Sequence, residues 1–280
     1  MPGPWEACLM KRFVLIACVA TLLAPVAANA ELRLWISYHF QGVDAYEAGK
    51  YRDAEALLTK AHTETCDEYR LAFTMDSAGQ THMALGEYPE AEKCLNAALC
   101  LRDADECGES SRFVPATLNN LADLHYIAGN KDKVECLYRR ALDLNKRDSY
   151  SVEVGRSLNG LALVAADAGN VAEAENLLKR AVRVHFMGGR SEHPYMATAL
   201  VNLGILYTEQ GKYAEAKDSL LKAKHIQDEV LGCNHPDVAI RLHAEANLLA
   251  KSGCADAARS AQEKANAIQE SFAKLNAKQG

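Results

Sequence analysis

The stretch Leu203-Gly-Ile-Leu-Tyr-Thr-Glu-Gln-Gly-Lys-Tyr-Ala-Glu-Ala216 carries the pattern that decides the fold of this 280-residue chain. At its centre is Gly211, with a small residue seven positions before it and an alanine five positions after it. Leu220 and Ala223 follow nine and twelve positions after the same glycine. Two helices joined by a tight turn explain this order. Glycine tolerates the positive φ of such a turn, and small residues let the two helices approach closely.

The pattern recurs along the chain. Six glycines hold the turn position, at spacings of 37, 43, 40, 42 and 42 residues: Gly49, Gly86, Gly129, Gly169, Gly211 and Gly253. Seven residues before each of them stands Gly or Ala, and twelve residues after each stands Ala. Each hairpin has an apolar face that it cannot bury alone, so successive hairpins must stack. We therefore predict an all-α fold, a right-handed α-solenoid of six stacked helical hairpins.

The repeats are expected in one solenoid domain over residues 31–280. Their predicted ranges lie near 35–68, 72–106, 115–148, 155–190, 194–231 and 236–272. Pro115, Pro194 and Pro236 each stand where a first helix should begin, and proline is well tolerated at the first position of a helix. The composition agrees with this, because only 7% of residues are aromatic and 49% are apolar. A net charge of −6 without basic runs argues against nucleic-acid binding, which needs clustered Lys and Arg.

Residues 1–30 have the three-part layout of a secretory signal peptide. Lys11 and Arg12 precede an apolar run over residues 13–23, and the small-x-small site Ala28-Asn-Ala30 follows. We therefore expect an exported protein, periplasmic or secreted. Met10, directly before the basic pair, is an alternative start.

A retained membrane anchor is the rival interpretation of the same segment. A membrane-spanning helix needs ~20 apolar residues, and Pro25 and Asn29 interrupt this run. The exported chain should then contain no membrane span, because no later stretch approaches that length.

The repeats resemble the tetratricopeptide repeat family. The likeness rests on the stretch 203–216, on Gly49-Lys-Tyr-Arg-Asp-Ala54 and on Leu121-Ala followed by Gly129. The period of about 42 residues and the connector Gly232-Cys-Asn-His-Pro236 are similar to the long repeats of kinesin light chains. The resemblance covers residues 34–272 and implies a protein–protein interaction module without a cofactor.

We find no sequence motif for catalysis. The chain has no His-Glu-x-x-His, no Walker loop, no Gly-x-Ser-x-Gly and no dinucleotide fingerprint. The repeats also leave no room for an attached catalytic domain. We therefore expect no enzyme activity, no metal and no cofactor. His193 and His235 occupy equivalent connectors and are expected to cap helices.

The concave side of the solenoid is the predicted working surface, because the first helices of such hairpins line it. Helical spacing places positions ten, six and three residues before each glycine on that side. These positions and their neighbours give a candidate peptide-binding groove of Asn119, Asn120, Asp123, Tyr126, Arg156, Asn159, Leu163, Asn202 and Ile205.

Two of these residues carry the peptide hypothesis. Asn120 and Asn202 stand nine residues before their glycines, where the resemblance implies an asparagine that holds a bound peptide backbone. A side-chain amide can both donate to and accept from such a backbone. The alternative is that these asparagines satisfy neighbouring helix ends or face water, and Gly160 interrupts the series in the fourth repeat.

The predicted function is an exported scaffold or adaptor that binds a peptide segment or a partner helix in this groove. The alternatives are an accessory or small-ligand receptor subunit of a periplasmic or envelope complex, and an architectural element that self-associates through its end repeats. Cys66, Cys100 and Cys107 should lie at one end of the stack, so a disulfide among these three is expected.

Overall fold

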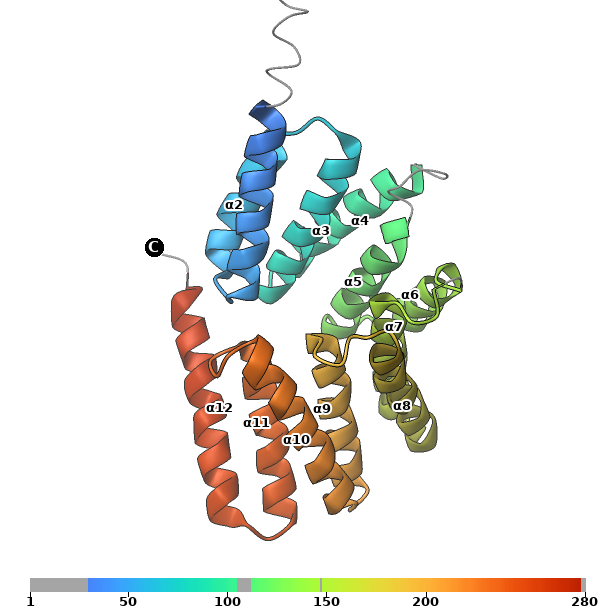
Figure 1. Ribbon diagram of the computed structural model, residues 1–280, viewed down its shortest axis with the longest axis vertical. Coiled ribbons are helices and arrows are strands. Elements are labelled where there is room, and N and C mark those ends of the chain that lie inside the picture. The colour runs from blue at the N-terminus through green and yellow to red at the C-terminus, as the bar shows by residue number, and fades with distance from the viewer. Residues whose placement is uncertain (1–29, 105–111, 147, 278–280) are drawn as a thin grey trace, which may run out of the picture.

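The computed structural model describes residues 30–104, 112–146 and 148–277, and all regular structure in these ranges is helical. In chain order the α-helices are residues 30–47, α2 (Tyr51–Thr63), α3 (Glu68–Ala84), α4 (Tyr88–Ala104), α5 (Val114–Ile127), α6 (Lys131–Leu144), α7 (Val152–Asp167), α8 (Val171–Met187), α9 (Pro194–Glu209), α10 (Tyr213–Val230), α11 (Pro236–Lys251) and α12 (Ala255–Leu275). They form six successive hairpins that stack side by side (Figure 1). The predicted all-α solenoid is confirmed.

The predicted signal peptide lies almost wholly outside the described residues. Among the residues that are described, none of the helices has both the length and the apolar character needed to cross a membrane.

The turns inside the hairpins are built as the glycine pattern predicts. The six turn glycines have φ between +72° and +85°. At Gly211, its own N–H donates to the Thr208 carbonyl at 3.2 Å, and the Lys212 N–H donates to the Tyr207 carbonyl at 2.9 Å. This arrangement satisfies the last carbonyls of the first helix and turns the chain sharply into the second.

Within each hairpin a small residue of the first helix faces a large residue of the second. A Cβ placed on Gly79 would lie 2.6 Å from Leu95 Cγ, and one on Gly204 would lie 2.7 Å from Leu220 Cγ. Either distance is too short for two carbon atoms, so a larger side chain would push the helices apart. The alanines twelve residues after the turn glycines are fully buried at all six positions.

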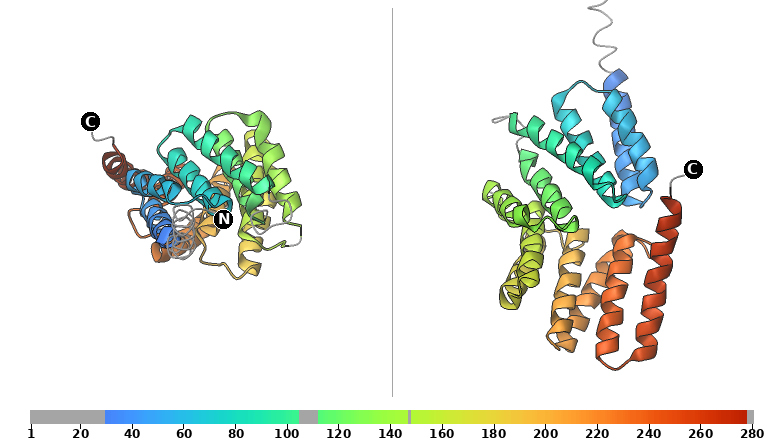
Figure 2. Two further views of the ribbon diagram at one scale, coloured as in Figure 1. Left: turned by 90° about the horizontal axis from the view of Figure 1, so that it is seen from above. Right: turned by 180° about the vertical axis from the view of Figure 1, so that it is seen from behind.

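The two ends of the solenoid meet. The C-terminal end of α12 lies beside the turn between the helix of residues 30–47 and α2 (Figures 1 and 2). Asn276 Oδ1 accepts from the Tyr51 N–H at 2.7 Å, and Asn276 Nδ2 donates to the Gly49 carbonyl at 2.9 Å. Phe272 fills the space where a Gly49 side chain would be, since a Cβ there would lie 1.9 Å from the Phe272 ring. We call these four residues the closing contact.

The expected disulfide is corrected in part. Cys66 and Cys100 are both exposed free thiols, so they are not bonded to each other. Sharing one end of the stack fixes the height of two residues but not the direction in which their side chains point. Cys107 lies outside the described residues.

Replacing Gly211 by Val should lower the free energy of unfolding by about 1–3 kcal/mol, because the left-handed conformation strains a β-branched residue. A Cβ at Gly211 meets no atom within 4 Å, so crowding does not contribute. Gly211→Asn is the matched control, since asparagine tolerates this conformation better. Chemical denaturation measures both variants. Equal losses for Val and Asn would contradict a backbone cause.

Replacing Asn276 by Ala should separate the two ends of the solenoid, because it removes both hydrogen bonds of the closing contact. We expect a larger radius of gyration in small-angle X-ray scattering, with the helix content unchanged by circular dichroism. Asn266→Ala is the control, because Asn266 is an exposed residue of the same helix. Identical scattering curves for the two variants would show that Asn276 does not hold the ends together.

Candidate functional site

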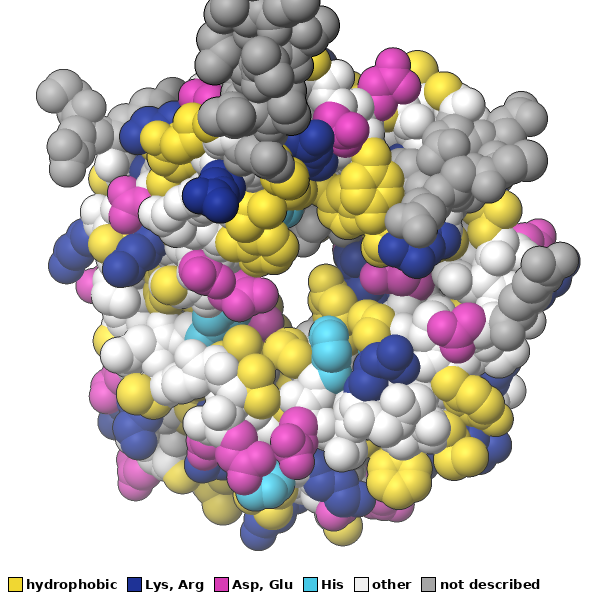
Figure 3. Space-filling view, turned by 45° about the horizontal axis from the view of Figure 1, so that its top comes forward, with side chains coloured by type: hydrophobic (Ala, Val, Ile, Leu, Met, Phe, Trp, Pro, Cys, Tyr) yellow, Lys and Arg dark blue, Asp and Glu magenta, His cyan; other side chains and the backbone are white. Residues whose placement is uncertain are grey.

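A hollow lies in the middle of the closed solenoid. Figure 3 shows it in the space-filling view, with hydrophobic, acidic, basic and histidine side chains around its rim. The first helices of successive hairpins are neighbours: α5 contacts α7, α7 contacts α9, and α9 contacts α11. The sequence predicts that these first helices line the concave surface, and we call that surface the wall of the hollow.

Arg156 of α7 is the hub of the hydrogen bonds on this wall. Its Nη2 donates to Asn120 Oδ1 at 2.7 Å and to Asp123 Oδ2 at 2.8 Å, both on α5. Its Nη1 donates to Glu153 Oε2 at 3.3 Å, one turn earlier on α7. The Arg156 guanidinium also lies over the Tyr195 ring of α9, 4.7 Å from its centre. One side chain therefore ties three first helices together.

Residues far apart in the sequence meet around this arginine. Tyr46 comes from the first hairpin, yet it interacts electrostatically with Arg156, Tyr195 and Asp237. The Tyr46 ring also packs against the Tyr51 ring, with centroids 5.4 Å apart. Only closure of the solenoid brings the first hairpin next to the fourth, fifth and sixth. We call Tyr46, Arg156, Tyr195 and Asp237 the central cluster.

Two histidines each position a member of the central cluster that lies two residues later in the sequence. His193 Nδ1 accepts from the Tyr195 N–H, and His235 Nδ1 accepts from the Asp237 N–H, each at 3.2 Å. Both are helix N-caps, as expected from their equivalent connectors. The same His-Pro turn therefore fixes the first turn of α9 and the first turn of α11.

Asp237 lacks a full counter-charge. Its nearest basic atom is His235 Nδ1 at 3.8 Å, and that nitrogen is already the acceptor for the Asp237 N–H. Burial among the neighbouring helices raises the pKa of the Asp237 carboxyl, although its side chain remains 40% exposed. The carboxylate is thus partly enclosed by protein but still exposed to solvent.

The asparagines predicted to bind a peptide divide into two groups. Asn119 is fully buried; its Nδ2 donates to the Glu153 carbonyl at 3.0 Å, and its Oδ1 accepts from Ser157 Oγ at 2.7 Å. Asn120 is buried beside Arg156. Both amides are therefore used to join first helices, which agrees with the structural alternative for them.

Asn159 and Asn202 form the second group. Asn202 Nδ2 donates to Asn159 Oδ1 at 2.8 Å, which links α7 to α9. Both side chains are partly exposed. Their other amide atoms, Asn159 Nδ2 and Asn202 Oδ1, have no hydrogen-bond partner in the described part of the chain. The pair therefore offers one donor and one acceptor.

The remaining predicted groove residues differ in exposure. Asp123 binds Arg156, and Tyr138 donates to the same carboxylate. Tyr126 and Leu163 are partly buried, while Ile205 is exposed. Ile205 lies one turn after Asn202 on α9, where its apolar side chain is free to contact a ligand.

Sequence reasoning missed Tyr46, Tyr195 and Asp237. A signal for two of them was present, because Tyr195 and Asp237 each follow a His-Pro pair and stand sixteen residues before their glycines. Tyr46 stands three residues before Gly49, as Tyr126 stands before Gly129. What no pattern indicated was that the first hairpin folds back to meet the later ones.

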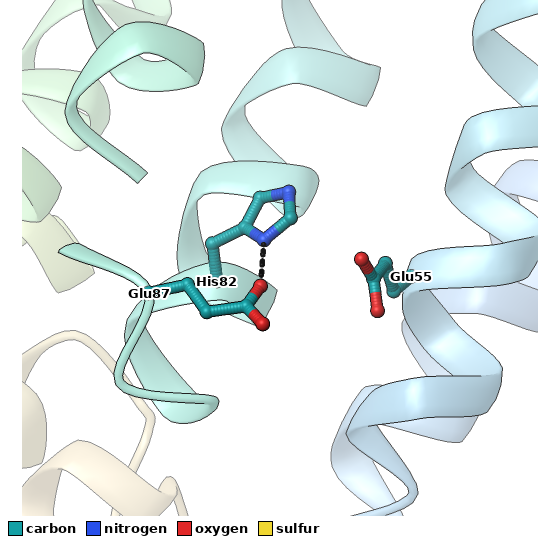
Figure 4. A group of neighbouring side chains, drawn as sticks. All are labelled: Glu55, His82 and Glu87. Carbon is teal, nitrogen blue, oxygen red and sulfur yellow. Dashed lines mark hydrogen bonds and ion pairs between the residues drawn. The ribbon is translucent and has the colours of Figure 1, made fainter. Parts of the chain in front are cut away.

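A second polar group, Glu55, His82 and Glu87, has the composition of a metal site (Figure 4). Its ligand atoms lie within 4.8 Å of one another. However, Arg52 Nη1 pairs with Glu55 Oε2 at 2.8 Å, and Arg52 Nη2 pairs with Glu87 Oε1 at 2.9 Å. One guanidinium is shared between both carboxylates, so we interpret the group as an ion-pair network that joins the first two hairpins.

Comparison with known proteins shows which repeat family this chain matches. The tetratricopeptide repeat model matches residues 71–147 and 195–271, and a second model of the same description matches 159–228. A kinesin light chain-related protein of Arabidopsis thaliana is 24% identical over 174 residues, which is 60% of this chain and 26% of the relative. The chain thus spans about a quarter of that protein.

Solved structures share the fold at low identity. A Rap protein complexed with competence and sporulation factor has a TM-score of 0.64 and 14% identity, over 87% of this chain and 76% of that one. BtubC (BKLC) from P. vanneervenii has a TM-score of 0.56 and 17% identity, over 81% and 91%. A putative kinesin light chain of Podosopora anserina with nearly identical TPR-like repeats has a TM-score of 0.51 and 23% identity, over 74% and 98%.

A buried histidine lies directly behind the wall. His185 of α8 is 1% exposed, and neither of its ring nitrogens has a hydrogen-bond partner. Its ring is stacked parallel to the His193 ring, with centroids 6.1 Å apart. A Cβ on Gly155 would lie 2.3 Å from His185 Nε2, so the histidine fills a notch of α7. Burial lowers the pKa of His185 to about 4, and the charges of His193 and Arg190 act in the same direction.

Acidification should therefore destabilise the fold through His185. In the unfolded chain this histidine takes up a proton below its ordinary pKa of about 6.5, whereas in the folded chain it stays neutral down to about pH 4. Its contribution to stability is complete above pH 6.5 and falls by up to about 3 kcal/mol as the pH drops to 4.

Denaturation of the wild type and of His185→Phe across pH 4–8 measures this effect. Phenylalanine keeps a flat ring in the notch but cannot bind a proton. The difference in free energy of unfolding between the two proteins should therefore change with pH. Parallel curves would show that His185 does not couple stability to pH.

Proposed function

Because the chain belongs to the tetratricopeptide repeat family, we propose that it is a protein–protein interaction scaffold that holds a peptide segment of its partner against the wall of the central hollow. A partner helix is the other occupant that the predicted groove would fit. We place the protein outside the cytoplasm, periplasmic or secreted, on the basis of the signal-peptide layout of residues 1–30.

The observation that carries the proposal is the Asn159–Asn202 pair. Each asparagine uses one amide atom to bind the other and keeps its second amide atom for a ligand, so the pair is held in place before any ligand arrives. An extended peptide backbone presents alternating N–H and C=O groups, which match one free donor and one free acceptor. Ile205, one turn further along α9, adds an apolar contact.

The solved relatives support a binding role for this architecture. The Rap protein of similar fold was solved in complex with competence and sporulation factor. We assign no catalytic role, because Asp123 and Glu153 pair with Arg156 rather than standing as an acid and a base.

A second candidate function has one observation in its favour. The central cluster brings four polar or aromatic side chains from four hairpins to one place. Convergence of this kind also suits a receptor for a small ligand, and an accessory or receptor subunit of an envelope complex is the alternative that follows from it.

Replacing Asn202 by Ala should weaken peptide capture about tenfold, since it removes one hydrogen bond to the ligand and frees Asn159 to rotate. The measurement is titration of a peptide enriched from a random display library by the wild-type protein. Asn96→Ala is the control, because Asn96 is exposed on α4, a second helix. Unchanged affinity in Asn202→Ala with unchanged helicity would remove the Asn159–Asn202 pair from the binding surface.

A further inference from the structure

The charges of the central hollow are unbalanced in one direction. Asp123 and Glu153 both pair with Arg156, so this guanidinium is shared between two carboxylates. Asp237 adds a third carboxylate without a strong partner. Asp123, Glu153, Asp237 and Arg156 all act electrostatically on Tyr195, so three carboxylates and one guanidinium gather around this tyrosine, an excess of two negative charges.

Nearby cations reduce this excess but do not remove it. Arg190, which acts electrostatically on His193, donates to the Tyr150 carbonyl at 2.9 Å in the connector before α7. Arg241 of α11 is buried and bound to Glu245 and Gln227. Glu245 neutralises Arg241, whereas Arg190 binds a neutral carbonyl and keeps its charge, so an excess of one negative charge remains.

Aromatic rings surround the same place. Tyr46 and Tyr195 both interact with Asp237, and Tyr51 packs on Tyr46. All three tyrosines are partly exposed. The faces of aromatic rings attract cations, and the attraction is stronger where water is partly excluded. The wall already contains one such contact, in which the Arg156 guanidinium lies over Tyr195 at 4.7 Å.

We propose that the central cluster binds a basic side chain, Lys or Arg, of the captured peptide, with Asp237 as its counter-ion and Tyr46 and Tyr195 as its aromatic walls. This inference rests on the proposed function, and it adds the chemical class of the ligand. The basic side chain would supply the counter-charge that Asp237 lacks. The Asn159–Asn202 pair, on the neighbouring α7 and α9, would hold the backbone of the same peptide.

Selection from a random peptide display library tests the proposal. The wild-type protein should enrich peptides that contain Lys or Arg, and Asp237→Asn should lose that enrichment. Asp218→Asn is the matched control, because Asp218 is an exposed carboxylate of α10 that pairs with Lys222 at 2.6 Å. Circular dichroism checks that each variant is folded.

A double-mutant cycle then locates the contact. The change Asp237→Asn should weaken an enriched basic peptide about tenfold, and should weaken the same peptide with its basic residue replaced by Gln less than twofold. Tyr46→Leu should likewise weaken the basic peptide more than the Gln peptide, because it removes the aromatic face.

The outcomes separate this inference from the proposed function. If the wild type enriches no peptide at all, the proposed function fails and the inference fails with it. If it enriches peptides without a basic preference, or if Asp237→Asn keeps the preference, the scaffold role stands and the inference is overturned. If spermidine binds while no peptide is enriched, the site takes a small cation and the peptide proposal is overturned.

Discussion

The whole architecture depends on how closely the two helices of each hairpin approach. A glycine or alanine on the first helix faces a leucine or tyrosine on the second, and the distances at Gly79 and Gly204 leave no room for even one added methyl group. Protein interiors are packed as densely as crystals of small molecules, so such a notch fixes position as well as distance. The notch recurs in five of the six hairpins, since the exposed Gln262 stands at the large position of the last, and the stacking of these hairpins sets the rotation from one to the next.

The shape of the hollow follows from that rotation. Each hairpin turns by a small amount relative to the last, and the sum of these turns carries α12 back to the first hairpin. Tyr46 thereby reaches Arg156, Tyr195 and Asp237, which no local interaction would bring together. The central cluster is thus a product of the superhelix as a whole, while the Asn159–Asn202 pair is a product of two adjacent hairpins.

The sequence was sufficient for the fold and for part of the site. The spacing of Gly, Ala and Leu predicts helices, turns and stacking, because each of these depends on residues less than fifty positions apart. The wall was harder to predict. Asn119 and Asn120 are neighbours in sequence, but one residue turns a helix by 100°, and both amides point between helices.

The closure of the solenoid could not be predicted from the repeat pattern. A change of a few degrees in each hairpin, summed over the array, would carry the last helix past the first or leave it short. Only the final contacts of Phe272 and Asn276 with the first turn reveal that the ends meet. The repeat pattern ends before these two residues, since its last matching alanine is Ala265.

The meeting of the two ends also limits how this protein can evolve. Open solenoids gain and lose repeats readily, because a duplicated hairpin simply lengthens the array. Here a seventh hairpin would occupy the place where α12 now touches Gly49 and Tyr51. Duplication or deletion of a repeat would therefore break the contacts that hold the two ends together.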